Sequence, residues 1–177
     1  MGAIEDKIRE LGYTLPGEVT PGGNYVPTVT VPDAGLVYTA GHVARRIDGT
    51  LITGKLDDDV SIEEGYEAAR VTALNLLGSL KHQLGDLDRI TQVVKLLCMV
   101  NCTPDFLQPP AVANGCSDFL VEVFGDKGRH ARSAVGMASL PNNVCVEIEM
   151  IVEVSAEWLL CSNGASAKPC APTNTPV

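Results

Sequence analysis

Aromatic and basic side chains are both scarce in this chain of 177 residues. Aromatic residues make up 5% and hydrophobic residues 45%, so aliphatic side chains must build the core of what should be one domain. The 13 Lys and Arg residues stand against 22 Asp and Glu, and the net charge is −9. Only Arg45 and Arg46 are neighbouring basic residues. Charge-driven binding of nucleic acid requires a basic cluster, so the composition argues against nucleic acid as a partner.

Long apolar runs and paired cysteines are missing as well. No apolar stretch reaches the length of about 18 residues that a membrane-spanning helix requires, and residues 1–7 lack a secretory apolar segment. The cysteines form no C-x-x-C pair and no zinc-type Cys/His spacing. Four of the six fall in predicted helices or strands, where a thiol packs as a small apolar group. We therefore predict reduced thiols, no metal site, no membrane partner and a cytoplasmic setting.

Hydrophobic periodicity predicts helices over residues 3–12, 61–84 and 110–124. The longest begins with the capping box Ser61-Ile62-Glu63-Glu64 and ends at Gly85. Strands are predicted over residues 28–31, 36–44, 50–53, 90–102, 129–139 and 144–154. This order predicts an α+β domain with one mainly antiparallel sheet and two long helices on one face. We divide the chain into an N-terminal helix and loop (1–22), the domain (23–157) and a flexible tail (158–177).

The segment 129–154 contains the first candidate site. Its second strand alternates, with Val146 and Ile148 on one side and Glu147 on the other. In its first strand Arg132 and Ala134 share a face. If that face continues the face of Glu147, an anion-binding cation and an acid/base group lie side by side. The alternative is a cross-strand ion pair without chemistry.

Two further segments suggest contacts with a ligand. Gly41 interrupts a predicted strand, which indicates a bulge or a close approach to the backbone. His42 beside it either contacts a ligand or is a hydrogen-bonded histidine of the sheet. Tyr25 lies in a Gly-rich loop, where an aromatic ring either covers a pocket or anchors the loop. The strand at 90–102 alternates little and is expected to be covered on both faces.

Together these residues resemble the RidA/YjgF family. The most specific part runs from Ala131-Arg132-Ser133 to Leu140-Pro141 and then to Val146-Glu147-Ile148-Glu149. Supporting similarity lies in Asn24-Tyr25-Val26, in Tyr38 to His42, in the helix that begins near Ser61, and in Asp105-Phe106 followed by Asn114. The resemblance extends from about Gly23 to Val154.

The resemblance implies a chorismate-mutase-like fold and a homotrimer, in which the sheets form a central barrel with clefts between subunits. It implies hydrolysis of reactive enamine and imine intermediates, made by pyridoxal-phosphate enzymes, to 2-oxo acids and ammonia. Arg132 resembles the residue that binds the substrate carboxylate, and Glu147 the residue that activates water. No metal or organic cofactor is implied. The positions that resemble the substrate pocket are Tyr25, Gly41, His42, Asn114 and Ala134.

The chain departs from the deaminase pattern at two places. Typical deaminases have Ser-Gly-Gln where this chain has Ala40-Gly41-His42, and Cys where it has Ala134. A hydroxyl and a thiol are missing, and an imidazole has been added. An alternative function is therefore a non-catalytic trimer that binds small carboxylate or carbonyl metabolites. A third function named for the family, endoribonuclease or translation inhibitor, fits poorly with the acidic composition.

Overall fold

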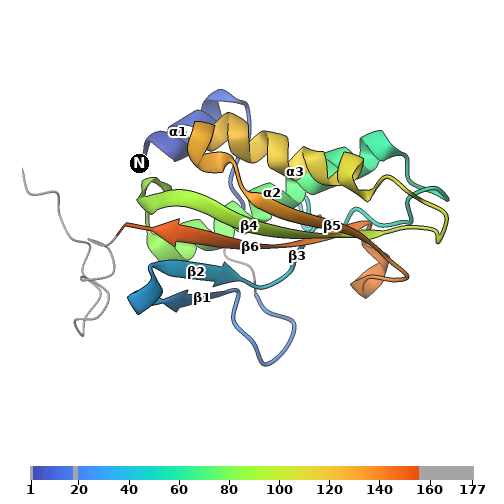
Figure 1. The fold of residues 1–177 in the computed structure, drawn as a ribbon, viewed down its shortest axis with the longest axis horizontal. Coiled ribbons are helices and arrows are strands. Elements are labelled where there is room, and N and C mark those ends of the chain that lie inside the picture. Colours follow the sequence, from blue (N-terminus) through green and yellow to red (C-terminus); the bar gives the residue numbers. More distant parts are fainter. Residues whose placement is uncertain (1, 18–19, 156–177) are drawn as a thin grey trace, which may run out of the picture.

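The computed structural model describes residues 2–17 and 20–155 as a single sheet with helices packed on one side (Figure 1). The helices are α1 (Ala3–Glu10), α2 (Ile62–Leu84) and α3 (Pro109–Phe124). The strands are β1 (Thr28–Val31), β2 (Leu36–Thr39), β3 (His42–Val43), β4 (Ile90–Asn101), β5 (Ala131–Met137) and β6 (Val146–Val154). Short 3₁₀ turns connect them: η1 (Pro32–Ala34), η2 (Leu87–Arg89), η3 (Gly125–Gly128) and η4 (Pro141–Asn143).

The sheet has the strand order β1-β2-β6-β4-β5, and β3 pairs with β6 beside β2. Every pair is antiparallel except β4 with β5, which run parallel. The predicted α+β class and mainly antiparallel sheet are confirmed. The predicted strand 36–44 is split into β2 and β3 at Ala40 and Gly41. The predicted strand 50–53 is wrong, because its residues make only isolated bridges, from Leu51 to Arg45 and from Thr53 to Val144.

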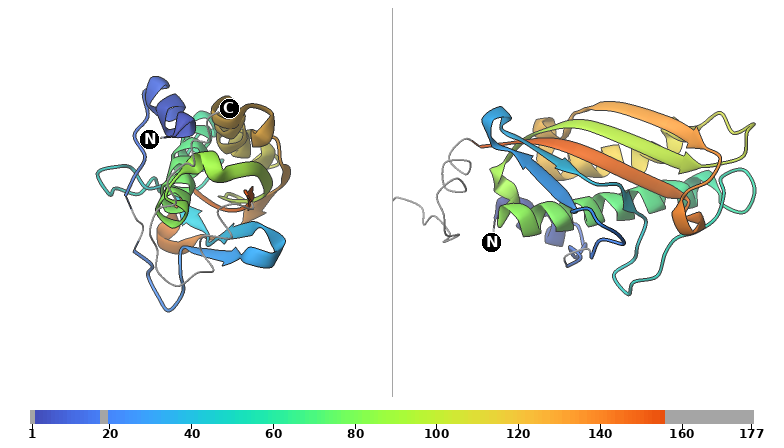
Figure 2. Two further views of the ribbon diagram at one scale, coloured as in Figure 1. Left: turned by 90° about the vertical axis from the view of Figure 1, so that its left-hand side faces the viewer. Right: turned by 90° about the horizontal axis from the view of Figure 1, so that it is seen from below.

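Local sequence signals explain the ends of α2. The Ser61 hydroxyl accepts a hydrogen bond from the Glu64 amide (3.2 Å), and the Glu64 carboxylate accepts one from the Ser61 amide (2.9 Å). The predicted capping box is therefore confirmed. Gly85 ends the helix in the left-handed conformation (φ 75°). The α2 and α3 helices pack against each other on one face of the sheet (Figure 2), and Ile8 of α1 joins the same core.

Within residues 2–17 and 20–155, no helix packs on the second face of the sheet. In β4, Leu96, Cys98 and Val100 are buried, whereas Leu97 and Met99 on the other side are only partly buried. The prediction that residues 90–102 are covered on both faces is thus wrong for the single chain, because both long helices pack on one side. We call the uncovered side the open face. Its aligned side chains include Val29, Tyr38, Val43, Lys95, Leu97, Met99, Ser133, Val135, Glu147, Glu149 and Ile151.

The predicted tail, residues 158–177, lies outside the described residues, as do Cys161 and Cys170. None of the helices formed by residues 2–17 and 20–155 is both long and apolar enough to cross a membrane. The division at residues 22 and 23 stays a prediction.

Candidate functional site

Arg132 projects from edge strand β5 toward α3. Its position aligns with Leu96, whose side chain is buried beneath the helices, so Arg132 is on the helix face. Its Nη1 donates to Asn114 Oδ1 (2.9 Å) and to Ser117 Oγ (2.9 Å), and Nη2 lies 3.4 Å from the carbonyl oxygen of Pro110. Asn114 and Ser117 share one side of α3 because they are three residues apart. The helix therefore holds the guanidinium with neutral acceptors.

Ser117 is itself held by His130. The Nδ1 atom of His130 lies 2.6 Å from the Gly128 carbonyl oxygen, which can only accept, so the neutral ring carries its proton there. Nε2 is then an acceptor, and the Ser117 hydroxyl donates to it across 3.0 Å. Burial lowers the pKa of His130, and the positive charge of Arg132 lowers it further, against the opposing bond to Gly128. The ring is therefore held neutral beside the guanidinium.

Arg132 has no acidic partner among the described residues, and its Nε has no acceptor there. Two donors, Nε–H and one Nη2–H, thus remain for a planar anion such as a carboxylate. Ala134 lies two positions along β5 on the same face and is half-buried against the core. The Arg132 group, as we call Arg132, Asn114, Ser117, His130 and Ala134, is a cationic pocket wall.

Glu147 lies on the open face of β6, where it aligns with Met99 on one side and Val43 on the other. Its carboxylate lies against Gly41: a β-carbon at Gly41 would be 2.1 Å from Glu147 Oε1. The absence of a side chain at Gly41 thus permits the Glu147 carboxylate to approach the backbone closely, as the glycine in a predicted strand indicated. Burial raises the pKa of Glu147, and the negative charge of Glu149 raises it further. We call Gly41 and Glu147 the Glu147 group.

Within the described part of the chain, Glu147 has no hydrogen-bond or ion-pair partner. It is half-buried, so its carboxylate is partly desolvated without compensation. Arg132 and Glu147 are therefore both incompletely satisfied, with opposite charges.

The prediction that the face of Arg132 continues the face of Glu147 is wrong for the single chain. Strand β4 lies between β5 and β6, and Arg132 aligns with Leu96 and then with Met150, both buried under the helices. Glu147 belongs to the opposite set of side chains. Strands β5 and β6 do not pair with each other as a hairpin. Each pairs with β4, β5 in parallel and β6 antiparallel, on opposite edges of that strand. The cross-strand ion pair considered as the alternative is excluded for the same reason.

His42 belongs to neither group. The residue is 5% exposed, and its ring nitrogens lie 2.9 Å from the Ala40 carbonyl oxygen and 2.7 Å from Ser79 Oγ of α2. It aligns with Ile148, on the helix side, so it points away from Glu147. Burial lowers its pKa, opposed by the bond to Ala40. His42 is therefore a hydrogen-bonded sheet histidine in this chain.

Tyr25 lies apart from Arg132. It is 55% exposed in the loop before β1, at the edge of the sheet opposite β5, and its hydroxyl accepts from the Gly22 amide (3.3 Å). Sequence reasoning missed Ser117 and His130. The available signals were the spacing of Ser117 one helical turn after Asn114 and the position of His130 on the same side of the strand as Arg132.

This chain is similar to known proteins over segments that contain both the Arg132 group and the Glu147 group. The sequence model of the family described as "YjgF/chorismate mutase-like, putative endoribonuclease" matches residues 5–154. Protein TCP17 of Trypanosoma cruzi is 39% identical over 156 residues, which are 87% of this chain and 96% of that protein.

Two solved structures are similar to this chain in both sequence and fold. The Agrobacterium tumefaciens protein Atu1372, of unknown function, is 41% identical with a TM-score of 0.80, over 86% of this chain and 93% of that one. A Shewanella oneidensis protein described as a "putative endoribonuclease" is 30% identical with a TM-score of 0.82, over 86% of this chain and 100% of that one. The similarity therefore includes the segments that carry Gly41, Arg132 and Glu147.

Proposed function

This chain belongs to the YjgF/chorismate-mutase-like family, and from that membership we propose that it hydrolyses reactive enamines and imines to 2-oxo acids and ammonia. The observation that carries the proposal is the pair of unsatisfied groups. Among the described residues, Arg132 is oriented by neutral partners and lacks an anion, and Glu147 is partly buried and lacks a donor or cation. A small 2-imino acid has the complementary parts, a carboxylate for Arg132 and an electrophilic carbon for a water activated by Glu147.

The proposed site lies where copies of the chain meet. Because Arg132 and Glu147 are on opposite faces, one substrate can touch both only if the two residues come from different copies. The open face supports such an assembly, because Val29 (52% exposed) and Tyr38 (42%) stand uncovered on it. A homotrimer with sheets facing a central barrel, as the family resemblance implies, would cover this face and create inter-subunit clefts.

The proposed reaction uses the two groups in sequence. Arg132 donates two hydrogen bonds to the substrate carboxylate, while Asn114 and Ser117 fix the plane of the guanidinium. The Glu147 carboxylate accepts a proton from water as the water oxygen bonds to the imine carbon, and the C=N electron pair moves to nitrogen, which takes up a proton from solvent. The protonated Glu147 then gives its proton to the amine nitrogen of the tetrahedral intermediate. The C–N bond breaks and ammonia leaves, while the hydroxyl releases its proton to solvent and becomes the carbonyl. Orientation supplies much of the rate, because an imine carbon is already electrophilic.

A non-catalytic role, binding small carboxylates or carbonyl metabolites, is the second candidate. One observation favours it: Ala40 and Ala134 carry no hydroxyl or thiol, and the His42 imidazole is turned toward Ser79 and replaces neither. Within this proposal we also expect a cytoplasmic setting. The described cysteines are free and buried, and burial raises the pKa of Cys98 to about 12 and of Cys145 to about 11.

A coupled assay separates the candidates. A pyridoxal-phosphate dehydratase generates 2-iminobutanoate, and release of the 2-oxo acid is followed with the wild-type protein, with Arg132→Ala and with Arg132→Lys. Acceleration that is lost in Arg132→Ala and reduced in Arg132→Lys supports the deaminase, because lysine keeps the charge but not the planar fork. Equal acceleration by all three proteins contradicts the role of Arg132.

Calorimetry with 2-oxobutanoate completes the design. Binding without acceleration, lost in Arg132→Ala, favours the binder. We expect Arg132→Ala to weaken binding by about ten- to a hundredfold, the scale of hydrogen bonds to a charged group. Absence of both binding and acceleration in a correctly folded protein contradicts both candidates.

A further inference from the structure

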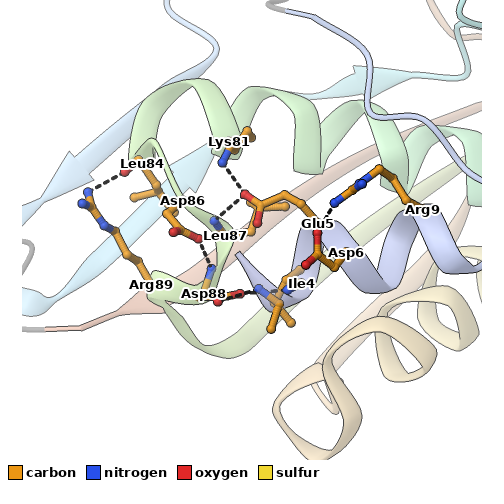
Figure 3. A network of polar contacts seen from close by, with 11 residues as sticks. Ile4, Glu5, Asp6, Arg9, Lys81, Leu84, Asp86, Leu87, Asp88 and Arg89 are labelled. Carbon is orange, nitrogen blue, oxygen red and sulfur yellow. Dashed lines mark hydrogen bonds and ion pairs between the residues drawn. The ribbon is translucent and has the colours of Figure 1, made fainter. Parts of the chain in front are cut away.

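Helix α1 packs on the turn between α2 and β4 through a network of polar contacts (Figure 3). No contact between these two segments was predicted from the sequence. The Asp88 carboxylate in η2 accepts hydrogen bonds from the Ala3 amide (2.7 Å) and the Ile4 amide (2.8 Å). Asp88 thereby caps a helix from a distant part of the chain, where the helix dipole favours negative charge. This contact brings Glu5 of α1 beside Asp86 and Asp88.

Glu5 is the buried member of this network. It is 4% exposed, and its Oε1 accepts from the Leu87 amide (3.1 Å) and from the Lys81 ammonium. Its Oε2 is buried without a hydrogen-bond partner in the part of the chain that the structure describes. Burial works to raise the pKa of Glu5, but the bonds from Lys81 and Leu87 bring it below its ordinary value. The Lys81 ammonium at Oε1 favours the ionised carboxylate, whose other oxygen stays unsatisfied inside the protein, which is unfavourable without a further partner.

The orphan oxygen of Glu5 points toward the two aspartates. A β-carbon at Gly2 would lie 2.3 Å from Asp86 Oδ1 and 2.4 Å from Glu5 Oε2, with the Asp88 carboxyl carbon 2.8 Å away. These oxygens thus converge beside the Gly2 backbone, where glycine leaves the space that a side chain would fill. Glu5, Asp86 and Asp88 each offer an oxygen within 4.8 Å of the others.

The described residues nearby supply too little positive charge for three carboxylates. Lys81 bonds Glu5, whereas Arg89 donates to the Leu84 carbonyl oxygen (2.6 Å) and Arg9 pairs with Asp6. The α1 N-terminus adds only a fraction of a charge, roughly one half. A cluster with a net negative charge and an unsatisfied buried oxygen matches the donor set of a hard cation.

We propose that Glu5, Asp86 and Asp88 bind a hard divalent cation, of the Ca²⁺, Mn²⁺ or Mg²⁺ class, which fastens α1 to the turn between α2 and β4. Each carboxylate contributes oxygen, and water completes the coordination on the exposed side of Asp88. The site uses no residue of the Arg132 or Glu147 groups. It stands independently of the proposed deaminase activity.

The test titrates the full chain, after treatment with a chelator, with CaCl₂, MgCl₂ and MnCl₂. Calorimetry is expected to give one site per chain, and the melting temperature is expected to rise with cation concentration. Mn²⁺ should broaden the amide NMR signals of Ala3, Ile4 and Leu87 before others, because paramagnetic relaxation is local. No binding heat for any of the three cations, or broadening spread evenly over acidic surface residues, would overturn the proposal.

The variant Asp86→Asn tests the site without removing the turn. Its side-chain oxygen can still accept from the Asp88 amide, as Asp86 Oδ1 does at 3.0 Å, but the charge is gone. We expect affinity to fall by at least about tenfold, the scale found even for outer-shell partners of metal ligands. Asp6→Asn is the matched control. Asp6 lies in α1 beside Glu5, but it is exposed and paired with Arg9, so this variant should bind the cation as the wild type does. Equal affinity of Asp86→Asn and Asp6→Asn would contradict the site.

Discussion

Arg132 and Glu147 stand on opposite faces of one sheet, with β4 between their strands. Arg132 faces α3 and Glu147 faces outward over Gly41. A site that uses both residues therefore requires two copies of the chain, and the proposed activity depends on assembly.

Assembly should depend on the open face. Ile151 lies in β6 between Tyr38 and Lys95 on that face. We expect Ile151→Lys to convert a trimer to a monomer, because it places a second positive charge beside Lys95 on a face that assembly would cover. Light scattering gives the mass, and turnover should disappear with the trimer. Leu107→Lys is the control, since Leu107 is 86% exposed outside the sheet. A monomeric wild type, or an unchanged mass for Ile151→Lys, would contradict this prediction.

Glu147 should govern turnover and its pH dependence. Glu147→Gln should lower turnover by about 10²–10⁴-fold, the range for a general base, with a much smaller loss of binding. Because the base acts ionised, activity should rise with pH through the raised pKa of Glu147. Glu149→Gln removes a nearby negative charge, which lowers that pKa, so the rise should move to lower pH. A profile that stays in place would show that Glu149 does not act on the base. Equal losses of turnover and binding in Glu147→Gln would argue that Glu147 mainly positions another residue.

Gly41 should matter for activity more than for folding. In Gly41→Ala the new methyl group meets the mobile end of Glu147, which can move aside, so we expect a stability change of about 1 kcal/mol or less but a clear loss of turnover. Gly115→Ala provides the contrast, because its β-carbon would lie 1.8 Å from the Tyr66 carbonyl oxygen. There the helices must separate, and we expect a loss of about 1–3 kcal/mol or more. Denaturation by urea measures both, and the reverse order of stabilities would contradict the geometry.

Stability should fall in mild acid because of His42. Burial lowers its pKa in the folded state, so below about pH 6.5 the unfolded chain binds a proton that the folded chain does not. The stability is thus present above the unfolded pKa and is lost as pH falls through the folded one. His42→Gln, which restores the residue of the typical family pattern, should flatten this dependence. We would measure unfolding free energies at pH 7, 6 and 5. The remaining slope should come in part from His130, whose pKa is also lowered. Identical slopes for wild type and His42→Gln would rule out this role.

Much of the fold was predictable because its signals are local. The capping box at Ser61, the left-handed glycine at position 85 and the alternation of β6 depend only on neighbouring residues, and each was confirmed. The sequence also indicated the candidate site residues, because Arg132 and Glu147 are charged residues in predicted strands and Gly41 interrupts a predicted strand. The short strand at 50–53 failed because isolated bridges need partners from distant segments, which local propensity does not specify.

The sequence by itself determined the residue types, the helices, most of the strands, and the family to which the chain belongs. Only the tertiary structure decided which faces those residues occupy. Strand β4 lies between β5 and β6, and its register with both strands places Arg132 and Glu147 on opposite faces. The same long-range packing joins Ser117 to His130 and Glu5 to Asp86 and Asp88. These pairings depend on contacts between segments far apart in the chain, for which periodicity and spacing carry no information.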